Sequence, residues 1–378
     1  MKRIISILFI VPAFFANEIF AQDVSYRGQA SAWTNYNLAN ELDLWGGARY
    51  IPQLNFEYGT VAKGLFDIEA SANINGTLGT LPFDTLYSHG KIKPYRLWAR
   101  YSNQQLEIRA GLQKINFGSA SMIRPLMWFD KVDPRDPLQL TDGVWGILGR
   151  YYFLNNANVW LWTLYGNKEA KTWEIGNTSQ QRPEFGGRVQ LPVPKGEVAF
   201  SYHNREVDKS GMGEMPDIVE IVNENRFGLD GKWDLGVGLW FEAAWMQKGK
   251  NMGMFTNQVS ACIGTDYTFG IGNGLNMVFE QLLFAYDENP FGMENPYSFS
   301  ILSVNYPMGF SDNLSVLFYF DWNSNDIYNL VTWNHQFRRF TFYAMGYSNP
   351  KNYNIPLTAN EVNLFAGTGV QLMLVFSH

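Results

Sequence analysis

The sequence contains a single cysteine and only four histidines. Cys262 has no partner within the chain, so an intramolecular disulfide is excluded. The histidines form no zinc-spaced cluster with cysteine, and the nucleophile motif G-x-S-x-G does not occur. We therefore expect no catalytic residues, no metal and no cofactor, and a hydrolase is the least favoured class of function.

Charge is scarce as well. Charged residues make up 17% of the chain, whereas an ordinary soluble domain has about 25%. The formal net charge is −6, which argues against a nucleic-acid partner. Beyond the amino-terminal region, no apolar run reaches the roughly 18 residues of a transmembrane helix. A chain that crosses a membrane by helices is therefore not expected.

The amino terminus carries the pattern of an export signal. Two basic residues, Lys2 and Arg3, precede the apolar run IISILFIVPAFFANEIF and the small residue Ala21. A basic start, an apolar core and a small residue before a polar segment are typical of a secretory signal peptide. The sequence predicts a signal peptide over residues 1–21 and a single domain over residues 22–378.

Aromatic residues are abundant, at 16% of the chain. An exported chain that is rich in aromatics, poor in charge and without a spanning helix indicates a transmembrane β-barrel. The reason is that only helices and closed barrels satisfy every backbone polar group in lipid. We expect the outer membrane of a Gram-negative bacterium as its location, with outer-membrane lipid and the barrel-assembly machinery as partners. The oligomeric state stays open.

Strict alternation of apolar and polar residues supports this fold class. Over 65–75 and 184–191, every second residue is apolar or small and its neighbours are mostly polar, which is the period of a β-strand. The expected fold is all-β, a transmembrane antiparallel barrel of 18 strands. Because 297–306 and 327–335 are the weakest strands, 16 is possible. The expected strands are about 25–36, 45–57, 64–75, 93–102, 105–117, 144–153, 157–166, 183–192, 196–206, 225–234, 236–247, 256–268, 274–286, 297–306, 314–322, 327–335, 338–347 and 361–377.

The connections between these strands alternate in length. From the second strand onward, short links such as SNQ and VPK alternate with long ones such as NKEAKTWEIGNTSQQR. Outer-membrane barrels have short turns on the periplasmic side and longer loops outside. A soluble sandwich has no reason to sort its loops in this way. An 18-stranded barrel is also wide enough for an aqueous channel.

The polar strand faces are expected to line the lumen. Pairing across the short links is expected to place Arg100 opposite Glu107, and Trp98 opposite Arg109. In one interpretation these charges pair along the wall. In the other, the arginines form a basic strip that orients polar solutes. The candidate pore-lining residues are Asp67, Glu69, Arg96, Trp98, Arg100, Glu107, Arg109, Gln113 and Arg188.

One long connection, over residues 118–143, is a candidate constriction. It follows the fifth expected strand and contains three prolines, and loops of this length usually have a function. We expect it to fold into the barrel with Trp128 and Phe129 as apolar anchors; the alternative is a loop that closes over the outer rim. Its aspartates match no EF-hand spacing. The candidate residues are Arg124, Trp128, Phe129, Asp130, Asp133, Arg135 and Asp136.

A local motif resembles a known family. Arg109, Gly111, Gln113 and Gly118 form R-x-G-x-Q-x-x-x-x-G, and WFDKVDPRDP follows. This segment is similar to outer-membrane porins of the alginate-export type. The resemblance implies an 18-stranded channel for anionic or polar oligosaccharide-like solutes, with Arg96, Arg100 and Arg109 matching a basic lumen. The acidic candidates for the lumen, which depart from a strongly basic pore, are Asp67, Glu69, Glu107, Glu242 and Glu280.

The expected function is that of an outer-membrane porin. It passes small polar solutes, possibly anionic or sugar-like, by passive or substrate-selective diffusion, with residues 118–143 as the constriction. The alternative is a structural or secretion-associated barrel, which would be marked by a lumen plugged by its own loops. The sequence does not separate the two.

Overall fold

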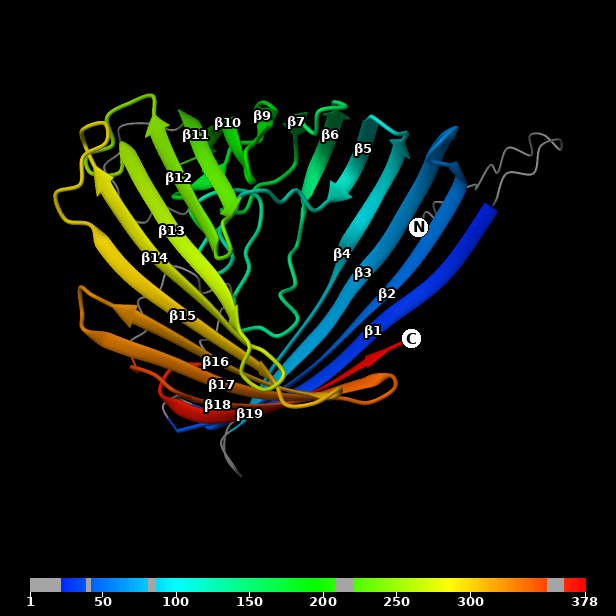
Figure 1. Ribbon diagram of the computed structural model, residues 1–378, viewed down its shortest axis with the longest axis vertical. Helices are drawn as coiled ribbons and strands as arrows, with labels where there is room; N and C mark the ends of the chain where they lie inside the picture. The colour runs from blue at the N-terminus through cyan, green and yellow to red at the C-terminus, as the bar shows by residue number, and fades with distance from the viewer. Residues whose placement is uncertain (1–21, 39–41, 81–85, 209–220, 352–363) are drawn as a thin grey trace, which may run out of the picture.

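The computed structural model describes residues 22–38, 42–80, 86–208, 221–351 and 364–378. These residues form an all-β protein (Figure 1). The strands are β1 (Gln22–Asn37), β2 (Leu44–Thr60), β3 (Gly64–Thr80), β4 (Leu86–Ser102), β5 (Leu106–Gln113), β6 (Val144–Tyr152), β7 (Asn158–Leu164), β8 (Asn177–Thr178), β9 (Glu184–Val193), β10 (Gly196–Asp208), β11 (Ile221–Asp234), β12 (Gly238–Lys248), β13 (Asn257–Phe269), β14 (Leu275–Asp287), β15 (Tyr297–Pro307), β16 (Asp312–Asp321), β17 (Asp326–Gln336), β18 (Phe340–Ser348) and β19 (Thr368–Ser377).

No helix in this part of the chain is both long and apolar enough to span a membrane.

The strands close into one antiparallel barrel. β1 pairs with β2 on one side and with β19 on the other, which joins the two ends of the sheet. β8 has two residues and pairs only with β10, while β7 pairs directly with β9. The barrel wall therefore has 18 strands, and the predicted count is confirmed. The two weakest predicted strands are present as β15 and β17, so the count of 16 is wrong.

The long connections gather at one end of the barrel, as the alternation in length predicted. The segments after β5 and β7 are long, whereas those after β4 and β9 are tight turns. Figure 1 shows the teal segment between β5 and β6 hanging inside the ring of strands. The predicted signal peptide, residues 1–21, and residues 361–363 of the last predicted strand lie outside the described residues.

The predicted pairings across two short turns are wrong by two residues. Arg100 lies opposite Arg109 rather than Glu107, and Trp98 lies opposite Gly111. The turn lies one residue later in the chain than expected, because the amide of Asn103 donates to the carbonyl of Leu106 at 2.8 Å and leaves Gln104 and Gln105 in the turn. The sequence also predicts Gln53 near Glu69 across the link between β2 and β3, and this register is shifted in the same direction, with Gln53 opposite Ser71. Since side chains alternate with period two, a slip of two residues leaves every side chain on its predicted face.

Each strand shows one face to the outside and one to the lumen. On β7, Leu161 is 65% exposed on the outside and Trp162 is 2% exposed on the inside. The expectation that lumen faces are polar is wrong for β14 to β18. There the inner face is apolar because loops pack on it and exclude water. Its buried residues are Leu282, Phe284, Phe299, Ile301, Leu317, Tyr319, Tyr328, Leu330, Met345 and Tyr347.

Candidate functional site

The loop between β5 and β6, residues 114–143, crosses the lumen. Near its end, Arg96 of β4 donates from Nη2 to the carbonyl (3.0 Å) and the hydroxyl (2.9 Å) of Thr141. Its middle binds two carboxylates on the far wall, those of Glu242 on β12 and Glu280 on β14. We call this segment the crossing loop.

Backbone amides of the crossing loop hold these two carboxylates. Glu242 accepts from the amides of Ala120 (2.7 Å) and Leu126 (3.0 Å). Glu280 accepts from three successive amides, those of residues 121–123, at 2.6 to 3.0 Å. Hydrogen bonds to a charged acceptor are stronger than neutral ones. The loop is therefore fixed to the far wall through its main chain, and its side chains are left for other contacts.

A glycine permits this close approach. Gly118 has φ +103°, and a Cβ on it would lie 2.2 Å from Oε1 of Glu242. Both the backbone angle and the missing space exclude other residues. The glycine that ends the predicted R-x-G-x-Q-x-x-x-x-G motif thus lies against the carboxylate that anchors the loop.

Aromatic packing adds a second fixation. Trp128 and Phe129 are 1% and 3% exposed and pack around Phe117 and the inward-facing Trp162 of β7. The Phe117 and Trp162 rings are stacked with centroids 5.6 Å apart. Leu126 and Ile123 join the same buried cluster. Trp128 and Phe129, the two predicted anchors, therefore lie in one buried cluster with inward-facing residues of the barrel wall.

A second loop, residues 165–183, packs on the crossing loop. The indole of Trp173 donates to the carbonyl of Arg124 at 2.7 Å, and the hydroxyl of Thr172 donates to the carbonyl of Asp130 at 3.2 Å. Trp173 is buried and lies beside Phe284 of β14. The filled side of the lumen therefore consists of two stacked loops on an apolar wall.

Buried ion pairs hold this second loop. Glu174 pairs with Arg226 of β11 at 2.5 Å and with Arg205 of β10 at 3.2 Å, and both arginines also pair with Glu224. Burial alone would raise the pKa of Glu174, but the two arginines outweigh it and hold that pKa below its usual value. Charges this deeply buried are tolerated only when they are paired.

The predicted wall arginines are paired along the wall. Arg100 donates to Asp67 at 2.9 Å from Nε and 2.6 Å from Nη2. Arg109 lies 3.1 Å from Glu107 and 4.6 Å above the ring of Trp98. These contacts fit the interpretation in which wall charges pair with each other.

The remaining predicted wall residues are also engaged. Arg188 is almost fully buried and pairs with Asp230 of β11 through two hydrogen bonds. Gln113 is fully buried and donates to the carbonyls of Arg109 and Gly146. Glu69 accepts a long hydrogen bond from Ser71 at 3.5 Å.

The charged residues of the crossing loop have different surroundings. Asp133 binds Arg135 through two side-chain hydrogen bonds, and the Arg124 side chain donates to the Phe117 carbonyl. Asp130 is 2% exposed, and neither of its carboxylate oxygens has a hydrogen-bond partner among the described residues. Burial raises the pKa of Asp130.

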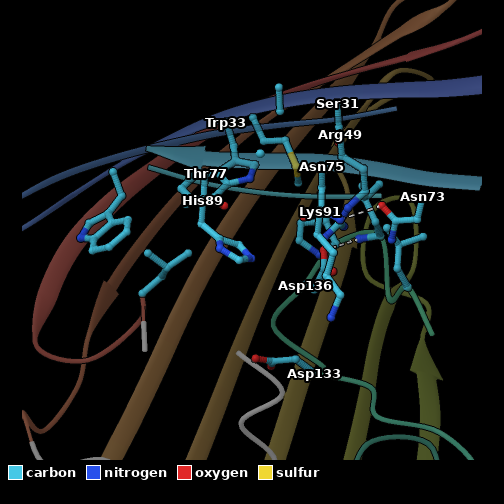
Figure 2. A pocket seen from close by; sticks show the side chains of 18 of the residues that line it. Ser31, Trp33, Arg49, Asn73, Asn75, Thr77, His89, Lys91, Asp133 and Asp136 are labelled. Carbon is cyan, nitrogen blue, oxygen red and sulfur yellow. Dashed lines mark hydrogen bonds between the residues drawn. The ribbon is translucent and has the colours of Figure 1, made fainter. Parts of the chain in front are cut away.

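An open cavity of about 330 Å³ lies between the crossing loop and the wall of β1 to β4. Figure 2 shows Trp33, Arg49, Asn75 and Lys91 on the wall side of this cavity and Asp136 near them. Burial raises the pKa of Asp136, and the amide of Leu138 and the charge of Arg49 partly offset this. We call this space the outer cavity.

Several lumen residues were not singled out as site candidates from the sequence. Arg150 of β6 lies 3.3 Å from Glu107 and 3.9 Å above the ring of Trp160. Arg49 and Lys91 line the outer cavity. All three occupy inward positions of alternating strands, which is a signal available in the sequence. Glu242 and Glu280 were expected in the lumen, but nothing in the sequence shows that they bind the crossing loop.

The fold is similar to that of known porins. OccAB4 from Acinetobacter baumannii has a TM-score of 0.54 and 10% identity over 94% of this chain and 98% of that chain. OmpF of Salmonella typhi, in complex with daunomycin, has a TM-score of 0.46 and 10% identity, over 94% of this chain and 97% of that chain. A mutant Rh. blastica porin has a TM-score of 0.45 and 12% identity, over 94% of this chain and 100% of that chain. No protein-family model and no curated protein matches the sequence. At such identity the likeness to OccAB4 shows the fold alone.

Proposed function

We propose that this protein is a channel of the bacterial outer membrane through which small polar solutes diffuse. The observation that carries this proposal is the outer cavity, which is open, lies beside the crossing loop and is lined in part by charged, amide and hydroxyl side chains. Apolar residues on the outer face and a polar wall inside suit a barrel with lipid outside and water inside. The proposed export signal, residues 1–21, and insertion by the barrel-assembly machinery belong to the same proposal.

The crossing loop is proposed as the constriction. It is anchored through Thr141 to Arg96 on the open wall, and through its backbone amides to Glu242 and Glu280 on the filled wall. Its charged stretch around Asp133 and Asp136 therefore borders the remaining passage. The solutes proposed are small and polar, and the proposed range includes anionic and sugar-like molecules. Two features support this range: the amide and hydroxyl groups that line the outer cavity, and the local resemblance to alginate-export-type porins.

Planar-bilayer conductance of the purified, folded protein tests this function. We expect discrete conductance steps, because charged, amide and hydroxyl side chains line the outer cavity and would hold water there. Protein that folds and inserts but produces no steps would contradict the channel.

The filled half of the lumen favours a second candidate, a barrel that serves a structural or secretion role. Two loops and an apolar wall close that side, which is the signature expected for a plugged barrel. The same conductance measurement separates the two functions, because a plugged barrel inserts without conducting.

A further inference from the structure

Three neighbouring strands place a cation, an amide and a second cation at one height of the open wall. Arg49 of β2 lies opposite Asn75 of β3, and Asn75 lies opposite Lys91 of β4. Adjacent strands are about 4.8 Å apart, so the Cα atoms of Arg49 and Lys91 are roughly 10 Å apart. Their long side chains reach one oxyanion placed above Asn75 from both sides. All three residues line the outer cavity (Figure 2).

Both cations are free to bind such a group. Within the described residues, neither Arg49 nor Lys91 forms a hydrogen bond or an ion pair, and Nε of Arg49 is buried without a partner. Lys93, two residues along β4, is by contrast paired with Asp142.

The crossing-loop side of the outer cavity carries negative charge near these residues. Asp133 is occupied by Arg135. Asp136 accepts a hydrogen bond at Oδ1 from the amide of Leu138, and none of the cations among the described residues is bonded to it. Lys131 also lines this side of the cavity. Asp136 is therefore the carboxylate that is available to a ligand across from Arg49.

We propose that the outer cavity is a binding station for a zwitterionic solute of amino-acid type. Its carboxylate lies over Asn75 between Arg49 and Lys91, and its ammonium group lies against Asp136. A simple anion would be repelled by the negative charge of Asp136, and a simple cation would be repelled by the positive charges of Arg49 and Lys91. A molecule that carries both charges therefore fits best. The cavity volume, about 330 Å³, is in the range of small-molecule sites. This inference rests on the proposed channel function, which brings solutes to the cavity.

Equilibrium binding of three matched probes tests the inference. The probes are serine, N-acetylserine, which lacks the cationic charge, and serinamide, which lacks the anionic one. We expect saturation-transfer NMR on the full-length protein in detergent to show serine binding at least ten-fold tighter than either analogue. Equal or tighter binding of N-acetylserine would make the cavity an anion site and overturn the proposal.

Three variants assign the two ends of the ligand. We expect Arg49→Gln and Lys91→Gln each to weaken serine binding about ten-fold. Asp136→Asn is expected to weaken serine binding but to strengthen binding of N-acetylserine, which a merely structural role would not do. Lys168→Gln, an exposed cation of another outer loop, is the matched control and should change neither affinity. An unchanged serine affinity in Asp136→Asn refutes the ammonium contact.

Glycerol entry into proteoliposomes separates this inference from the channel function. Glycerol carries no charge and reports the passage alone. Glycerol entry without serine binding would overturn the binding station and leave the channel standing. Serine binding without glycerol entry would support the station and overturn the channel.

Discussion

The inner wall of β1 to β5 and the inner wall of β14 to β18 differ in what covers them. The first carries amides and charges beside the outer cavity. The second carries aliphatic and aromatic side chains beneath two loops. The same alternation produces both walls, since outward-facing residues are apolar in each. The difference shows that a barrel strand can be apolar on both faces without being lipid-exposed on both, provided that another segment covers the inner one.

Ion pairs divide in the same way. In the filled half, Arg205, Arg226 and Glu224 are at most 2% exposed in their side chains. In the open half, the side chains of Lys93 and Asp142 are 27% and 55% exposed. Burial raises the pKa of Asp142, but the hydrogen bond and the charge of Lys93 lower it by more. The pKa of Asp142 is therefore below its usual value. Pairing fixes the loops in the filled half and contributes little to folding in the open half.

Removing the crossing loop is the strongest test of this division. Deletion of residues 122–138 should raise single-channel conductance several-fold, because the loop fills the lumen beside the outer cavity. It should also lower the thermal unfolding temperature, since Leu282 and Phe299 would lose their apolar cover. A deletion of residues 251–254 in another outer loop is the control. Unchanged conductance would refute the constriction.

Breaking the buried ion pairs should destabilise far more than breaking the exposed pair. Arg226→Ala leaves Glu174 and Glu224 with fewer partners in a buried site, so we expect a loss of about 3–5 kcal/mol in the free energy of unfolding. Lys93→Ala should cost less than about 1 kcal/mol. Urea unfolding followed by tryptophan fluorescence measures both. Similar losses in the two variants would show that the two halves do not differ.

Replacing Asp130 should increase the free energy of unfolding, whereas replacing the ion-pair residues should decrease it. Because burial raises its pKa in the folded protein, its ionised form costs stability at neutral pH. That cost falls as the pH drops through the raised pKa and is gone near the ordinary value of about 3.9. Asp130→Asn should therefore stabilise the protein by about 1–3 kcal/mol at neutral pH. The gain should vanish near pH 4 in thermal unfolding, and a gain independent of pH would contradict this account.

The smallest effect is expected on the open wall. The double variant Arg100→Ala with Arg109→Ala leaves Asp67 and Glu107 with fewer cations. The wall then becomes more negative, and the reversal potential in a salt gradient should shift slightly toward cation selectivity. Gln104→Ala, in the short turn between β4 and β5, serves as the control. An unchanged reversal potential would place this part of the wall outside the ion path.

Alternation of polar and apolar residues predicts the orientation of the candidate residues on the wall, but it does not predict the contacts of the crossing loop. Alternation identifies Arg100, Arg109 and Arg188 as inward-facing, and their partners lie on neighbouring strands at positions fixed by register. A turn that lies one residue later than expected still shifts the register by two residues. The contacts that fix the crossing loop could not be predicted, because Glu280 and the amide of Ser121 are 159 residues apart in the sequence.

The sequence by itself determined the barrel: the strand number, the side on which the long loops lie, and the face of each strand that points inward. These follow from local alternation and from turn length, which act over a few residues. Only the tertiary structure decided which inner strand faces are exposed to water and which are covered by loops. That outcome depends on where the crossing loop and the loop over residues 165–183 pack, and both loops are held by carboxylates and arginines on distant strands. Water is excluded wherever they cover the wall, and the uncovered wall keeps the charges that the proposed function uses.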